Sequence, residues 1–366
     1  MGRHARCLQL HSLIGWFLAI GFLVGLTTAC SRQGQSAHRA DTPARSVTLR
    51  GAGATFPFIL YKRWFTAYQQ DHPGTTVSYE AVGSGEGIRR FIGRNVKEEE
   101  RVDFGASDAA MTDTDMAAVD RGVVLLPVTA GGVVLAYDLP GVSGDLKLSR
   151  AACAGIFLGE IKNWNDPTIA RTNPGLKLPR LTIATVVRQD RSGTTFAFTN
   201  HLSAVSEKWR SRYGAATYID WPGNAMRAAG NEGVAGRIGH SIGAIGYVGY
   251  EFAHRLGLNL AVVENREGKF VKPAAESFAA ALAGAHMPDN LRVFMPDPPG
   301  ENAYPIVTFT WILLYKKYDA VKGPAIRDLF HWCLAQGQRY APQMGYLPLP
   351  ENMATKGASA LNRLLE

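Results

Sequence analysis

The sequence predicts an α/β protein with mainly parallel sheets and helices on both faces. Three observations support this fold class. Apolar segments with strand character alternate with segments of helical period from about residue 46 onward. Glycine-rich turns lead from a strand end into a helix start, as they do in open α/β sheets. Hydrophobic residues make up 46% of the 366 residues and charged residues 19%, which is typical of a globular protein with a substantial core.

The first 29 residues predict a secretory signal. Arg3 and Arg6 precede an apolar run from Leu13 to Leu26, and small residues lead up to Cys30. This order describes a cleaved signal rather than a membrane span, and a cysteine directly after the cut indicates lipidation. Leu26 lies four positions before Cys30 rather than the more usual three, so cleavage without lipidation and a retained anchor remain alternatives.

Residues 30–45 are polar and lack an apolar period, which predicts a flexible tether. Residues 46–366 are long enough for two domains of ordinary size. Loss of residues 1–29 removes two arginines and no acid, so the net charge falls from +8 to +6. This surplus is scattered rather than gathered in a stripe, and it does not predict a nucleic-acid-binding protein.

The first part of the chain predicts strands and helices in alternation. Residues 46–53 read as a strand, 57–70 as an amphipathic helix, 75–85 as a strand and turn, and 86–94 as a helix. The charged residues 94–101 predict an exposed loop, and residues 102–109 a short strand that ends in a loop.

The later segments continue the pattern. Residues 123–140 and 179–190 are rich in strand-forming residues, and residues 244–257 predict a strand that enters a helix. Cys153 and Cys333 each lie in an apolar helical pattern, which favours two buried free thiols over a disulfide. The histidines show no metal-ligand spacing, and no cofactor is expected.

Three strand-to-helix turns carry glycine together with a hydroxyl residue, at residues 51–56, 82–87 and 188–198. Backbone N–H groups at a helix start, with the positive end of the helix dipole behind them, favour an anion. Helix capping remains the alternative for Thr55, Ser84 or Asp108 taken singly. No turn has the lysine of a nucleotide P-loop, and Ser84 does not lie in a GxSxG motif, so a binding protein is favoured over an enzyme.

Several motifs occur together in a recognisable order: GAGATFP, VDFGASDA, LGEIKNWNDPTIARTNPGLKLP, RSGTTFAFTNHL, GAIGYV and YPIV. In this order the sequence resembles the phosphate-binding protein of the bacterial phosphate-specific ABC transporter over nearly all of residues 48–350. The resemblance implies a two-lobe periplasmic binding protein fold of type II whose hinge is crossed twice. Lobe 1 would comprise residues 46–138 and 312–366, and lobe 2 residues 139–311.

The same resemblance implies the ligand residues. Hydroxyl and N–H groups would come from lobe 1, and residues 192–194 of lobe 2 would complete the cage. Asp108 would accept a proton carried by the ligand, and Arg188 would supply a charged fork. Asp190 would hold Arg188 in place, although capping of the next helix is the alternative. The complete implied set is Thr55, Phe56, Ser84, Asp108, Arg188, Ser192, Gly193 and Thr194.

Three departures from the family pattern stand out. Arg191 occupies a position that is often glycine, where it would either lie at the mouth of the site or disturb the loop. GSGEG replaces the commoner GSSGG and brings in Glu86, for which an outward orientation is favoured. KEEER, before the third predicted strand, resembles an inserted loop.

The resemblance implies a monomeric phosphate receptor, lipid-anchored at Cys30 or free on the periplasmic or cell-surface side of the membrane. It would deliver phosphate to permease subunits in the inner membrane. A receptor of the same fold for sulfate or molybdate is the alternative, and a secreted phosphate-ester hydrolase is a third class.

Overall fold

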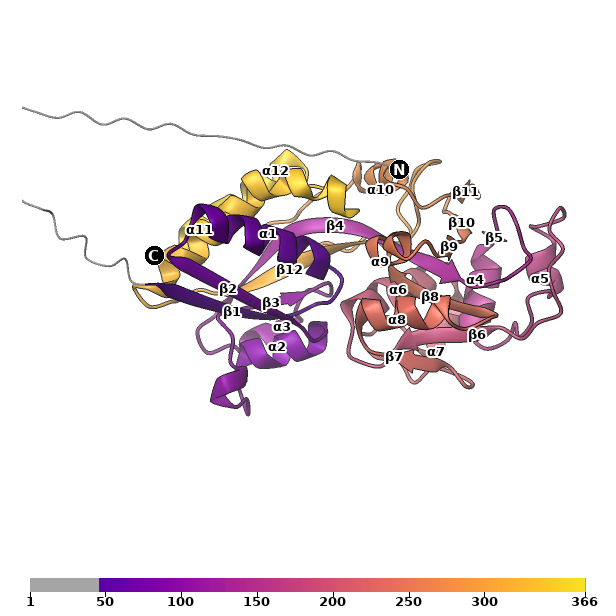
Figure 1. Ribbon diagram of the computed structural model, residues 1–366, viewed down its shortest axis with the longest axis horizontal. Coiled ribbons are helices and arrows are strands. Elements are labelled where there is room, and N and C mark those ends of the chain that lie inside the picture. The colour runs from indigo at the N-terminus through magenta and orange to yellow at the C-terminus, as the bar shows by residue number, and fades with distance from the viewer. Residues whose placement is uncertain (1–45, 366) are drawn as a thin grey trace, which may run out of the picture. The chain divides into compact units, whose positions relative to one another are not determined.

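The computed structural model describes residues 46–365, and these residues belong to one compact unit. The predicted signal segment, Cys30 and the whole of the predicted tether lie outside the described residues. Figure 1 shows a central sheet with helices packed on both sides, as the sequence predicted.

The central sheet has nine strands, which follow the order β2-β1-β3-β12-β4-β8-β6-β7, with β9 beside β4. The outer groups pair in parallel: β1 with β2 and β3, and β6 with β7 and β8. The strands are β1 (Val47–Gly53), β2 (Thr75–Ala81), β3 (Phe104–Ser107), β4 (Val123–Tyr137), β6 (Ala184–Arg188), β7 (Met226–Ala228), β8 (Ala244–Gly249), β9 (Asn259–Leu260) and β12 (Val307–Tyr315).

Strands β4 and β12 join the two parallel groups and run antiparallel to their neighbours. The first part of β4, residues 123–132, pairs with β12, whereas residues 133–137 pair with β8. The register between β12 and β4 shifts between Thr310 and Trp311. We call the β1, β2 and β3 group with its helices the first half of the unit, and the β6, β7 and β8 group with its helices the second half.

Helices cover both faces of the first half (Figure 1): α1 and α11 lie on one side of β1 and β2, and α2 on the other. In the second half, α8 packs on β6 and β8, and α6 also contacts β8. The helices are α1 (Phe58–Asp71), α2 (Ser84–Ile92), α3 (Asp113–Ala117), α4 (Arg150–Phe157), α5 (Pro167–Ala170), α6 (Gly193–Val205), α7 (Glu207–Arg212), α8 (Gly230–Gly239), α9 (Tyr250–Arg255), α10 (Ala275–Leu282), α11 (Lys322–Leu334) and α12 (Glu351–Asn362).

A small separate sheet has the order β11-β10-β5, built from Lys147–Leu148 (β5), Val262–Glu264 (β10) and Phe270–Val271 (β11). Most of the strands and helices that the sequence predicted are present, with ends that move by a few residues. The predicted loop at 94–101 is largely exposed and includes a short 3-10 helix, Glu98–Glu100.

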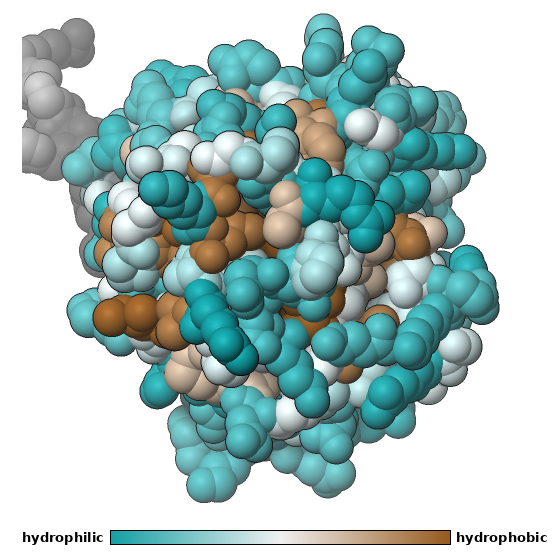
Figure 2. All heavy atoms as spheres, turned by 90° about the vertical axis from the view of Figure 1, so that its right-hand side faces the viewer, coloured by the Kyte–Doolittle hydropathy of each residue, from teal (hydrophilic) through white to brown (hydrophobic). Residues whose placement is uncertain are grey.

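The core is rich in large aromatic residues, among them four fully buried tryptophans: Trp64, Trp164, Trp209 and Trp311. Cys153 and Cys333 are buried free thiols, as predicted. The face in Figure 2 is mostly hydrophilic, with hydrophobic side chains in smaller patches between. Within residues 46–365, none of the helices combines the length and the apolar character that a membrane crossing requires.

Candidate functional site

Four helix starts meet where the two halves of the unit face each other. Thr55 and Phe56 lie just before α1, and Ser84 is the first residue of α2. In the second half, Ser192 caps α6 by accepting a hydrogen bond from the Thr195 N–H (3.1 Å), and Asn231 is the second residue of α8. Each of these helices has nine or more residues, so each directs a substantial positive dipole end toward this point.

Every predicted site residue is at least nine-tenths buried, except Asp190, whose side chain is 21% exposed. Ser84 Oγ accepts hydrogen bonds from the Asp108 N–H (3.2 Å) and from the Gly193 N–H (3.1 Å). A Cβ at position 193 would lie 2.6 Å from Asp108 Cβ and 2.7 Å from Ser84 Oγ. The two halves therefore approach closely here, and only glycine fits at position 193.

Asn231 forms a second connection between the halves, and the sequence analysis did not find it. Its N–H and its Nδ2 donate to Thr55 Oγ1, at 3.2 and 3.0 Å, and Nδ2 also donates to Thr194 Oγ1 at 3.1 Å. Its Oδ1 accepts from the Gly249 N–H at 2.9 Å. The fully buried Asn231 therefore fixes two of the predicted hydroxyl groups in place.

Arg188 lies at the end of β6 and is held by Asp190. Its Nε donates to Asp190 Oδ1 at 2.8 Å, its Nη2 donates to the other carboxylate oxygen, and its Nη1 donates to Thr194 Oγ1 at 3.3 Å. Burial opposes ionisation of Asp190, but hydrogen bonds and charge from Arg188 outweigh it and lower the pKa of Asp190. The predicted pairing is confirmed. Capping of the next helix by Asp190 is wrong, since Ser192 caps α6.

Asp108 lies at the end of β3 in a different environment. Its Oδ1 accepts a hydrogen bond from Thr310 Oγ1 at 2.8 Å, and its backbone carbonyl accepts from Thr308 Oγ1 at 3.2 Å. Burial raises the pKa of Asp108 to about 7 from an ordinary 3.8, against the lowering effects of the Thr310 hydrogen bond and the Arg188 charge. Both the protonated and the ionised form are therefore accessible near neutral pH.

Phe56 is fully buried, and its carbonyl accepts a hydrogen bond from the Tyr346 hydroxyl at 2.6 Å. The two rings pack edge to face with centroids 5.6 Å apart. Tyr346 lies in the C-terminal segment, about 290 residues farther along the chain, so a contact distant in sequence fixes the turn before α1.

The departures in sequence are accommodated in different ways. Glu86 pairs with Arg89 and Arg90 of its own helix, and the Arg89 hydrogen bonds are the main reason its pKa falls to about 2. The expected outward orientation of Glu86 is confirmed. The Arg191 carbonyl accepts a hydrogen bond from the Gly85 N–H at 2.9 Å, and its guanidinium lies 5.9 Å from the Tyr218 ring centroid.

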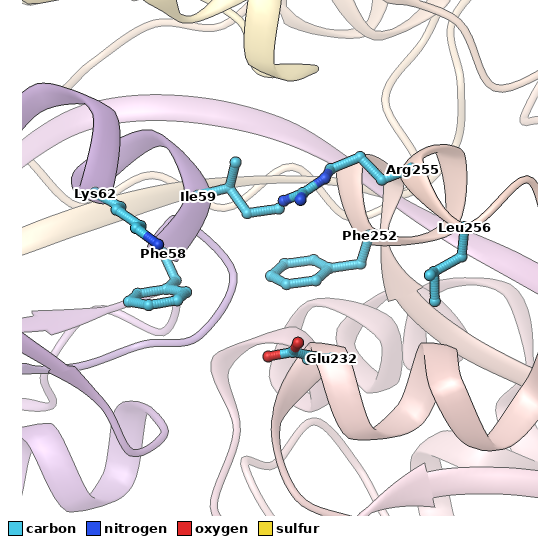
Figure 3. Close-up of a pocket in the computed structure, with 7 residues that line it drawn as sticks. All are labelled: Phe58, Ile59, Lys62, Glu232, Phe252, Arg255 and Leu256. Atoms are coloured by element: carbon cyan, nitrogen blue, oxygen red, sulfur yellow. The ribbon is translucent and has the colours of Figure 1, made fainter.

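Two neighbouring pockets lie beside this cluster. The smaller, about 210 Å³, is lined in part by Thr55, Asp190 and Asn231. The larger, about 350 Å³, shares three lining residues with it and is shown in Figure 3: α1 side chains on one side face α8 and α9 side chains on the other. Its residues are Phe58, Ile59, Lys62, Glu232, Phe252, Arg255 and Leu256.

Comparison with known proteins identifies the family to which the chain belongs. A family model described as a PBP superfamily domain matches residues 35–335. The phosphate-binding protein PstS of Pasteurella multocida is 38% identical over 313 residues, which cover 84% of this chain and 88% of that protein. The chain belongs to the PstS family of phosphate-binding proteins.

Solved structures of periplasmic phosphate-binding proteins share the two-lobe α/β fold. A high-affinity periplasmic phosphate-binding protein bound with phosphate aligns with a TM-score of 0.72 at 23% identity, over 86% of this chain and 93% of its own. The phosphate-binding protein of Stenotrophomonas maltophilia aligns with a TM-score of 0.69 at 20% identity, over the same shares. At these identities the structures establish the fold alone.

Sequence reasoning missed Asn231, Thr308 and Thr310. Asn231 follows Gly230 at a helix start, a signal that does not differ from ordinary capping. Thr308 and Thr310 alternate with apolar residues in the fully buried strand β12. Polar side chains inside such a strand need partners, so this pattern was the usable signal.

Proposed function

We propose that this protein captures inorganic phosphate between two lobes and delivers it to an ABC permease for import. The observation that carries the proposal is a buried cluster that combines one arginine fork, one carboxyl of raised pKa and hydroxyl groups from both halves of the unit. The PstS relatives support the choice of ligand. The proposed ligand residues are Thr55, Phe56, Ser84, Asp108, Arg188, Ser192, Gly193 and Thr194.

The chemistry of the cluster suits a protonated oxyanion. Arg188 and the four helix starts favour negative charge in a site that excludes water. Ionised Asp108 accepts hydrogen bonds only, so it favours an anion that carries a proton and disfavours one that carries none. Phosphate is protonated at neutral pH, whereas sulfate is not.

Closure would bring the two lobes together around the ligand. The hinge we propose lies where the chain passes between the halves, along β4 near Gly132 and along β12 near Val307. The lobe boundaries predicted from the sequence lie a few residues farther along the chain, at 138 and 312, and they remain predictions. Small-angle scattering of protein stripped of carried-over ligand should show a smaller radius after phosphate is added, and an unchanged radius would argue against a hinge.

Calorimetry with phosphate, arsenate and sulfate tests the function. Phosphate has five heavy atoms, and about 1.5 kcal/mol per atom gives micromolar binding, which an ionic cage can exceed. We therefore expect phosphate and arsenate to bind at micromolar affinity or tighter and sulfate to bind much more weakly. Equal binding of sulfate would favour a receptor for another oxyanion, and turnover of a chromogenic phosphate ester would favour a hydrolase.

We also propose that Cys30 carries a lipid anchor, because it directly follows a small-residue cut site. Cys30→Ala should move the protein from the membrane fraction to the soluble fraction. Cys153→Ala is a matched control, since that thiol is buried in the folded unit. Wild-type and C30A protein with the same membrane fraction would rule the anchor out.

A further inference from the structure

A second kind of contact joins the two halves next to the predicted ligand residues. Gly83 and Gly85, at the start of α2, lie against Asp190 and Arg191, which belong to the loop before α6. The Gly85 N–H donates to the Arg191 carbonyl at 2.9 Å, a direct backbone bond between segments that belong to opposite halves. This bond brings the backbones of the two loops into direct contact.

The approach leaves no room for a side chain at position 85. A Cβ there would overlap Arg191 Cβ, and it would lie 3.1 Å from Arg191 Cδ and 3.3 Å from Arg191 Cγ. Arg191 Cβ is attached directly to the backbone and cannot turn away as the end of a long side chain can. Gly85 has an ordinary negative φ, so its backbone conformation does not require glycine. The neighbouring arginine is the reason for glycine at this position.

Three contacts surround this point and involve the predicted ligand residues themselves. Gly193 approaches Ser84, Asn231 bonds to Thr55, and the Asp190 carboxylate that holds Arg188 packs against Gly83. A steric clash between positions 85 and 191 would therefore disturb all three contacts, because each of them depends on the same separation of the halves.

We propose that Gly85 and Arg191 form a steric latch that permits full closure over the ligand: the bare backbone of Gly85 accepts the Arg191 backbone and Cβ only when position 85 has no side chain. The latch rests on the proposed function, because it acts in the closed, ligand-bound state. It makes Gly85 a positioning residue for binding, although Gly85 need not touch the ligand.

The first test is Gly85→Ala. Overpacking of this size should weaken phosphate binding roughly fivefold to 150-fold by calorimetry, which corresponds to about 1–3 kcal/mol. The thermal midpoint of the ligand-free protein should match wild type, since an open protein separates the two positions. Gly236→Ala in α8 is the control, because a Cβ there meets nothing within 4 Å. Unchanged affinity in G85A would overturn the latch, and so would a ligand-free midpoint lowered by an equivalent amount.

Rescue by the partner residue gives a sharper test. Arg191→Gly and Arg191→Ala both remove the guanidinium, but only glycine removes the Cβ that blocks position 85. The G85A/R191G double variant should bind phosphate within about threefold of R191G, whereas G85A/R191A should stay about tenfold below R191A. Equal recovery in both double variants would overturn the latch, because it would assign the effect to the long side chain.

The wild-type titration separates the latch from the proposed function. If wild type binds sulfate rather than phosphate, the proposed ligand is wrong, and the same ratios between variants, measured with sulfate, still decide the latch. If wild type binds phosphate and the ratios are near one, the latch alone is wrong. A wild type that binds none of phosphate, arsenate and sulfate would overturn both.

Discussion

The two halves of the unit each place an aspartate at the same site, and the two residues behave in opposite ways. Asp190 in the second half is bound by a guanidinium at both oxygens, which lowers its pKa although burial opposes this. In the first half, the Thr310 hydroxyl is the one hydrogen-bond partner of the Asp108 carboxyl among residues 46–365, and burial raises the pKa of Asp108 to about 7.

The difference shows how one site can combine an aspartate that stays ionised with an aspartate that can gain or lose a proton. Arg188 is held by two hydrogen bonds to Asp190, and it directs a further donor at Thr194. Asp108 can hold or release a proton close to neutral pH, so it can respond to whether a ligand brings a proton of its own. A carboxylate paired like Asp190 would lose that freedom.

Removal of Arg188 is expected to have the largest effect. Arg188→Ala leaves Asp190, which is only 21% exposed, without its cation and removes the fork, so phosphate binding should weaken by about 3–5 kcal/mol in calorimetry. Arg188→Lys should lie between wild type and the alanine variant, because it keeps the charge without the planar fork. A loss under about 1 kcal/mol would place Arg188 outside the site.

Arg150→Ala provides the matched control for this variant. Arg150 also pairs with a buried aspartate, Asp297, but neither residue contacts the predicted ligand set in this structure. R150A should therefore change thermal stability without changing phosphate affinity. Equal losses of affinity in R150A and R188A would indicate a general effect on folding rather than loss of a ligand group.

The pH dependence of ligand-free stability should separate the two aspartates next. A group whose pKa is raised on folding stabilises the protein below its unfolded pKa, and this stability is lost as pH rises through the folded pKa. For Asp108 the loss falls between about pH 4 and pH 7, and at roughly 1.4 kcal/mol per unit it reaches up to about 4 kcal/mol. Asp190 has the opposite sign: its stabilisation is present above pH 4 and is lost at lower pH.

Thermal unfolding of wild type and Asp108→Asn between pH 4 and pH 8 measures how the contribution of Asp108 to stability depends on pH. The stability of wild type relative to D108N should decline as pH rises toward 7. The comparison between variants is required because burial also raises the pKa of Glu251, which adds a slope of the same sign to both proteins. A difference that stays constant with pH would contradict the raised pKa of Asp108.

The same Asp108→Asn variant should alter selectivity by a smaller amount. The amide keeps the size of the carboxylate and adds a donor, so sulfate should gain relative to phosphate by about 1–3 kcal/mol in competition titrations at pH 8. Glu86→Gln, which removes an acid that points away from the site, should leave the ratio unchanged. If wild-type protein binds sulfate as well as phosphate, both the role of Asp108 and the ligand assignment are wrong.

Residues in local motifs were predictable from the sequence, whereas long-range partners were not. Ser192 caps α6 as its position before an apolar helix indicated, and Arg188 pairs with Asp190 two residues away. Asn231 meets Thr55 across 176 residues, and Thr310 meets Asp108 across 202. A periodic pattern in the local sequence cannot reveal such contacts, because they arise from the order of the strands in the sheet.

The smallest expected effect comes from substitution of Thr310. Its neutral hydroxyl bonds to Asp108, as the Arg188 cation bonds to Asp190. Thr310→Val keeps the shape but removes a hydrogen bond that favours ionised Asp108, so the pKa of Asp108 should rise further. Phosphate affinity at pH 7 should fall by about 0.5–1.5 kcal/mol, and the deficit should shrink as pH rises and Asp108 ionises again. Calorimetry of both proteins at each pH cancels the titration of phosphate itself. A deficit that is equal at every pH would mean that Thr310 supports the packing of β12 rather than the charge state of Asp108.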